Sequence, residues 1–114
     1  MRFLTIYKSV ERGTPPTQKE MADMGKYIEE MAKKGVLLST EGCLPSAKGA
    51  RVRLSNGKIS VTDGPFTESK EVVGGFAILQ CKSKAEAIEL CKSFLKVAGD
   101  GESEIRELYE VPAM

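Results

Sequence analysis

The residues best suited to acid–base or ligand-binding chemistry stand in one charged stretch, residues 63–71 (DGPFTESKE). The turn after Asp63 contains a Gly-Pro pair, and the residue before a proline is kept out of the helical region, so the turn should be stiff. Such a turn would hold the Asp63 carboxylate at a pocket mouth as a base, with Lys70 and Glu71 supplying opposite charges nearby. The alternative is that Asp63 caps backbone N–H groups of its own turn while Phe66 fills the core.

Three residues outside this stretch are further candidates for binding a small molecule. Arg106 carries the planar guanidinium that grips a carboxylate with two hydrogen bonds, so it would hold an anionic substrate. The alternative is a structural ion pair of Arg106 with Glu41 or Asp63. Tyr7 and Glu41 are the other substrate-binding candidates, although a tyrosine such as Tyr7 is more often part of the core.

The chain has no histidine, which excludes Ser-His-Asp and Cys-His mechanisms and any metal site that needs an imidazole. Acid–base chemistry must then come from carboxylates, lysines, tyrosines or cysteines with shifted pKa values. Oxygen ligands for Mg²⁺ or Ca²⁺ are present at Glu41, Asp63, Glu68 and Glu71, but their spacing matches no metal loop. We therefore expect neither a metal nor a cofactor.

The three cysteines, Cys43, Cys81 and Cys91, include no C-x-x-C pair, so we expect reduced thiols rather than a disulfide or a zinc site. Cys81 and Cys91 fall on predicted core positions, and Cys91 should be shielded from reagents. Cys43 lies near the end of a predicted strand. No histidine exists to activate it, so an inert buried thiol is favoured over a nucleophile.

Length and charge limit the class of protein. The 114 residues make a single domain, 1–114. Seventeen basic and 16 acidic residues leave a net charge of +1, which does not favour binding to nucleic acid or anionic lipid. The N-terminus becomes charged too soon for a signal peptide, and no apolar run approaches the ~20 residues of a membrane span. These features predict a cytoplasmic protein with no nucleic-acid or membrane partner.

Periodicity and turn signals predict two helices and six strands. Two helices should begin after capping residues, Thr17 and Ser83, and end at glycines. Asn56-Gly57 is a strong hairpin signal. The predicted strands cover residues 2–8, 36–40, 50–55, 58–62, 75–81 and 104–111, and the apolar start of residues 36–40 predicts a buried strand. Without the hairpin the order is βαββαβ, so we expect an α+β fold that is ferredoxin-like, with an inserted β-hairpin.

The predicted strands are apolar on both faces, as in residues 2–8 and 75–81. Two helices can cover only one face of such a sheet. A second copy of the chain is the economical cover for the other face, so the pattern predicts a homodimer with sheet packed against sheet.

Residues 63–71, closed by Gly74-Gly75-Phe76, resemble the signature of the YCII-related, or DGPF, family of small bacterial dimeric α/β-barrel proteins. The resemblance continues at Tyr7, at residues 41–45 (EGCLP) and at residues 104–106 (EIR), so it spans nearly the whole chain. It implies a ferredoxin-like fold and a dimer, and little about activity, since most members are uncharacterised.

For related YCII proteins the resemblance implies a His–Asp pair, and one relative is a dehydrochlorinase of an aromatic degradation pathway. This chain lacks the histidine, so that mechanism cannot be carried over intact. It also has Glu107 where the family's last strand usually has a proline after the arginine.

Two functions from different classes remain open. The first is binding, and conversion, of a small polar or anionic metabolite beside residues 63–71. As an enzyme, the chain would be isomerase- or lyase-like and would use carboxylates for acid–base catalysis. The second is a non-catalytic accessory or regulatory module, since family members are often encoded beside alternative sigma factors, or a purely structural dimer.

Overall fold

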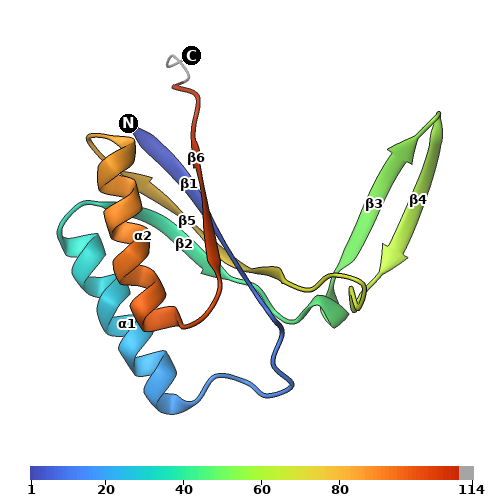
Figure 1. The fold of residues 1–114 in the computed structure, drawn as a ribbon, viewed down its shortest axis with the longest axis horizontal. Coiled ribbons are helices and arrows are strands. Elements are labelled where there is room, and N and C mark those ends of the chain that lie inside the picture. The colour runs from blue at the N-terminus through green and yellow to red at the C-terminus, as the bar shows by residue number, and fades with distance from the viewer. Residues whose placement is uncertain (111–114) are drawn as a thin grey trace.

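The computed structural model describes residues 1–110 (Figure 1). In chain order the elements are β1 (Arg2–Ser9), α1 (Gln18–Lys33), β2 (Leu37–Gly42), β3 (Ala50–Ser55), β4 (Lys58–Asp63), β5 (Val72–Gln80), α2 (Lys84–Ala98) and β6 (Glu102–Glu107), with a short 3-10 turn, η1 (Ser46–Lys48), before β3. Neither helix of this part of the chain is long and apolar enough to cross a membrane.

Four strands form one antiparallel sheet in the order β2-β5-β1-β6, while β3 and β4 pair only with each other. The two helices lie on the same face of the four-stranded sheet, and the β3–β4 hairpin projects from the opposite side (Figure 1). This confirms the predicted α+β, ferredoxin-like order with an inserted hairpin.

Local signals set the beginning and end of α1. Thr17 Oγ1 accepts a hydrogen bond from Glu20 N at 3.1 Å, and Glu20 Oε1 accepts one from Thr17 N at 2.9 Å, which is the predicted capping box. The Arg12 guanidinium binds both carboxylate oxygens of Glu20, at 2.9 and 3.0 Å. This contact, with the Thr17 hydrogen bonds, lowers the pKa of Glu20 to about 2. Gly35, at φ 75°, follows the helix as predicted.

The helix-facing side of the sheet carries the core. Phe3, Leu79, Cys81 and Ala87 are buried together, and β1 alternates so that Phe3 and Thr5 face the helices. The opposite, outer face carries Leu4, Ile6, Phe76 and Ile78, which pair as Leu4 with Ile78 and Ile6 with Phe76. These four side chains are half-buried, and neither helix of the described chain covers them.

Several predicted strands differ from the observed ones. The strand predicted at residues 36–40 as buried is an edge strand, β2, in which Leu38 is 51% exposed. The strand predicted at residues 75–81 already begins at Val72. The strand predicted at residues 104–111 covers Glu102–Glu107, and residue 111 lies outside the described residues.

The cysteines divide into two classes. Cys81 and Cys91 are buried, as predicted, and burial raises the pKa of both thiols. Cys43 is exposed, so its assignment as a buried thiol is wrong. The physical reason is that Cys43 follows the end of β2, which is an edge strand of the sheet.

Thiol labelling should follow this division. A bulky maleimide should modify Cys43 within minutes in the native protein and should reach Cys81 and Cys91 only after unfolding, because the thiolate of a buried cysteine is both inaccessible and disfavoured. Mass spectrometry should show one adduct in buffer and three in urea. Rapid triple labelling of folded protein would contradict the core placement of Cys81 and Cys91.

Candidate functional site

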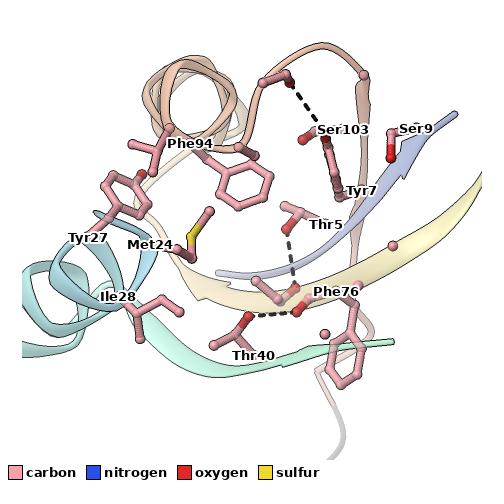
Figure 2. Close-up of a pocket in the computed structure, with 18 of the residues that line it drawn as sticks. Thr5, Tyr7, Ser9, Met24, Tyr27, Ile28, Thr40, Phe76, Phe94 and Ser103 are labelled. Atoms are coloured by element: carbon pink, nitrogen blue, oxygen red, sulfur yellow. Dashed lines mark hydrogen bonds between the residues drawn. The ribbon is translucent and has the colours of Figure 1, made fainter. Parts of the chain in front are cut away.

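A cavity of about 960 Å³ lies between α1, α2 and the helix-facing side of the sheet. Its interior is apolar. Figure 2 shows the side chains of Met24, Tyr27 and Ile28 from α1 and Phe94 from α2 gathered above the sheet. The ring of Phe76 lies on the other side of the sheet (Figure 2), consistent with its outer-face register.

Three hydroxyl groups of the interior are engaged with backbone carbonyls. Thr40 Oγ1 donates to the Phe76 carbonyl at 2.9 Å, and Thr5 Oγ1 to the Ala77 carbonyl at 3.4 Å (Figure 2). Tyr27 Oη is 3.1 Å from the Leu90 carbonyl. Each side-chain oxygen keeps acceptor capacity, so the interior can accept a few hydrogen bonds but offers few free donors.

The cavity opens at the end of the sheet where β1 and β2 finish and β5 and β6 begin. Arg12 and Glu20, paired with each other, line it from the β1–α1 connection. Glu41 lines it from the end of β2, Glu71 and Asp100 line it from the connections before β5 and β6, and all three are exposed. The mouth therefore carries three exposed carboxylates beyond the one that is neutralised by Arg12.

Tyr7 forms a fixed part of the wall. Its hydroxyl donates to the carbonyl of Asp100 at 2.9 Å, with the Gly99 carbonyl at 3.3 Å, and its ring meets Phe94 edge-on with centroids 5.3 Å apart. Gly101 makes this position possible, since a Cβ there would lie 2.7 Å from the Tyr7 ring. The hydroxyl proton of Tyr7 is thus committed to the α2–β6 turn.

The structure separates the residues predicted to form one site. Tyr7, Glu41 and Glu71 line the cavity. Asp63, Lys70 and Arg106 do not belong to its lining among the described residues. Asp63 was predicted to act as a base, and Lys70 and Arg106 to bind an anion. These roles remain predictions, and they do not concern this cavity.

Arg106 lies on the outer face of the sheet, opposite Leu4 in the pairing of β6 with β1. Its guanidinium is 3.4 Å from Glu104, whose other carboxylate oxygen binds Lys8 at 2.8 Å. These two cations lower the pKa of Glu104, Lys8 more than Arg106. The predicted ion pair with Glu41 or Asp63 is wrong in its partner, because alternation places Arg106 and Glu104 on the same face of β6.

The turn after Asp63 anchors the hairpin. Gly64 N donates to the Gly49 carbonyl at 2.9 Å, and Phe66 N donates to Ser46 Oγ at 3.1 Å. These partners replace the predicted capping by Asp63. Ser46 Oγ in turn donates to Glu11 at 2.8 Å, which ties the turn to the β1–α1 connection.

Arg51 completes this anchor. Its guanidinium lies 3.8 Å from the centroid of the half-buried Phe66 ring, it pairs with Glu68, and it donates to Ser69 Oγ at 3.0 Å. Of the charged residues in 63–71, Glu68 therefore helps to fix the base of the hairpin, while Asp63, Lys70 and Glu71 form no ion pair with the described residues.

The helical spacing of the methionines in α1 predicts that they only pack in the core. Met31 is buried and Met24 half-buried, while Met21 is 56% exposed, and all three line the cavity. A cavity wall and a filled core give the same helical periodicity, so no signal in the sequence distinguishes them. In residues 1–110 no three Cys, Asp or Glu side chains come together as a metal site.

Comparison with protein families identifies the family of this chain. The model of the YCII-related domain matches residues 1–111. An uncharacterized protein of Rhizobium meliloti (strain 1021), R00369, is 29% identical over 92 residues, which cover 80% of this chain and 74% of that protein.

A solved structure shares the fold at 15% identity: 5-chloro-2-hydroxyhydroquinone dehydrochlorinase (TftG) from Burkholderia phenoliruptrix AC1100, in complex with 2,5-dihydroxybenzoquinone. Its TM-score is 0.56, over 97% of this chain and 96% of that chain. With the family model spanning almost every residue, the chain belongs to the YCII-related family.

Proposed function

We propose that the chain binds a compact, ring-bearing and mostly apolar molecule in the cavity between the helices and the sheet. The observation that carries this proposal is the cavity itself, about 960 Å³ of space with an apolar interior and polar groups near one open end. Pockets for small molecules have this size and this distribution of polar groups.

The charges at the mouth favour a neutral ligand with hydroxyl donors over an anion. Glu41, Glu71 and Asp100 are acceptors facing solvent, and the nearby cation, Arg12, is already held by Glu20. A hydroxyl group of the ligand would donate to these carboxylates, whereas a carboxylate ligand would be repelled. The sequence predicted a small polar or anionic metabolite, and the charges at the mouth narrow this class of ligand to a neutral molecule with a hydroxylated ring. The complex of TftG with 2,5-dihydroxybenzoquinone supports the same class.

The proposal concerns binding, with conversion of the ligand as a further step. Because the chain has no histidine, the candidate bases lining the mouth are carboxylates, and Glu41, Glu71 and Asp100 are in no ion pair of the described residues. A base would therefore come from these three in preference to Asp63. The second candidate, a non-catalytic module, predicts no ligand in the cavity at all.

The homodimer and the cytoplasmic location belong to the same proposal. The uncovered outer face of Leu4, Ile6, Phe76 and Ile78 supports a second copy packed sheet to sheet. The free thiols of the described chain support a reducing compartment such as the cytoplasm.

Gly25 provides a test that leaves the fold intact. It lies on α1 and lines the cavity, and a Cβ there would meet nothing within 4 Å. Gly25→Leu should fill the cavity and strengthen the helix, because leucine is a better helix former than glycine. Hydroquinone at 100 times its Kd should stabilise the wild type by about 2.7 kcal/mol. The leucine variant should lose at least tenfold in affinity.

Gly25→Ala is the matched control and should keep hydroquinone affinity within about threefold, while gaining about 0.5–1 kcal/mol of stability from its helix propensity. Benzoate serves as the anionic probe in the same thermal-shift assay and should bind at least tenfold more weakly than hydroquinone. Equal binding by the leucine variant would place the ligand elsewhere, and tighter binding of benzoate would overturn the charge argument. Absence of any shift would favour the non-catalytic module.

A further inference from the structure

The β3–β4 hairpin, called the arm below (residues 50–63), has one apolar and one polar face. Its cross-strand pairs Val52–Val61 and Leu54–Ile59 lie on one face, while Arg53–Ser60 lies on the other. The four aliphatic side chains are between 63% and 72% exposed. Every residue of both strands is exposed, so nothing in the described chain covers either face.

Such an arm is costly for an isolated chain. A two-stranded ribbon alone is marginally stable in water, and a contiguous exposed aliphatic patch is typical of an interaction surface. The arm also extends the molecule: the radius of gyration is 16.0 Å, against about 13 Å for a compact domain of this size. Its base is nevertheless fixed, by the contacts of Gly64, Phe66 and Ser46 described above.

The position of the arm indicates what it meets. It stands on the side of the sheet opposite the helices, which is the side of the uncovered outer face (Figure 1). A groove of about 710 Å³ lies at its base, between β1, β5 and the start of β3. Leu44 and Val73 line this groove and are themselves exposed, so the apolar surface continues from the sheet toward the arm.

The area of the outer face also bears on what the arm contacts. Four strands of about six residues cover roughly 19 Å by 20 Å, or about 400 Å². A stable interface needs about 800 Å² from each partner. The outer face alone therefore falls short of a stable dimer, and the groove and the arm are the apolar surfaces continuous with it.

We propose that each arm reaches over a second copy of the chain and packs its apolar face, Val52, Leu54, Ile59 and Val61, against that copy. In a two-fold dimer the two arms make the same contact twice, so each protomer is held between the sheet and the arm of its partner. The inference rests on the proposed sheet-to-sheet dimer and adds a second contact to it.

Sedimentation equilibrium of the full chain tests the arm. Leu54→Asp places a charge on the apolar face and should raise the Kd of the dimer at least tenfold. Ser60→Asp places the same charge on the polar face of the arm and should leave the Kd within threefold. A double variant, Val52→Thr with Val61→Thr, keeps β-branched residues in both strands and should also raise the Kd at least tenfold, without breaking the hairpin.

Hydrogen exchange of the wild type supplies the second readout. Amides of β3 and β4 should be protected at concentrations above the Kd and should exchange at least tenfold faster after dilution below it. A wild type that is monomeric at 100 μM would overturn both the dimer and the arm contact. If Leu54→Asp, the double threonine variant and Ser60→Asp all gave dimers of equal stability, the arm contact alone would be overturned.

Discussion

Gly64→Ala should destabilise the protein by about 3 kcal/mol or more, which is at the severe end for a single added methyl group. The new Cβ would lie 1.7 Å from the Ser46 carbonyl oxygen and 2.6 Å from its carbonyl carbon. Both atoms are backbone, so no side-chain rotation relieves the overlap. The turn of residues 64–66 must separate from η1, and with it the base of the arm. Urea unfolding measures the loss, and the amide shifts of Ser46 and Gly49 locate it.

Gly13→Ala is the matched control for this substitution. A Cβ at Gly13 meets nothing within 4 Å, and no positive φ constrains the residue. Its free energy of unfolding should stay within about 0.5 kcal/mol of the wild type. If Gly64→Ala were equally neutral, the contact between residues 64–66 and η1 would not fix the arm.

The fold was predictable because its signals are local. Thr17 with Glu20, and Asn56-Gly57, each specify their own backbone geometry through neighbouring hydrogen bonds or positive φ angles. Together with the βαββαβ order they leave few topologies. The edge position of β2 could not be predicted in the same way, because the position of a strand within the sheet is set by distant partners.

The candidate site was predictable only in part. Charged residues such as Asp63 and Lys70 are obvious candidates in a sequence, yet neither lines the cavity, and Glu68 of the same stretch pairs with Arg51 at the base of the arm. The cavity is made instead by residues such as Phe94 and Met24, which look like ordinary core. Whether an apolar helix face packs tightly or stands away from a sheet depends on the separation of elements, which periodicity does not encode.

The role of a strand residue also depends on the face of the sheet to which its side chain points. Tyr7 and Arg106 lie on adjacent strands, but alternation points Tyr7 to the helices and Arg106 to the outer face. A sequence shows both as strand residues. The register of β1 against β6 shows that Tyr7 belongs to the cavity wall. It also shows that Arg106 lies at the rim of the surface proposed to bind a second copy.

Ile78→Asp should convert the protein to monomer. Ile78 pairs with Leu4 at the centre of the uncovered outer face, and a charge enclosed there between two sheets without a partner costs several kcal/mol. The wild type should sediment at about twice 12.4 kDa, and the variant at one chain's mass with its helical circular dichroism retained. Its dimer Kd should rise at least 1,000-fold, since 1.4 kcal/mol corresponds to tenfold.

Two companions make this result specific to the outer face. Ile78→Thr keeps a β-branched residue in β5 and should weaken the dimer with the fold intact, so unfolding of the aspartate variant would not hide the effect. Ile88→Asp places the same charge on the solvent side of α2, where Ile88 is already exposed, and should leave the dimer unchanged. A dimer that survives Ile78→Asp would move the interface away from the sheet. The apolar outer face would then need another partner, because four half-buried aliphatic and aromatic side chains on one sheet are not what a solvated face carries.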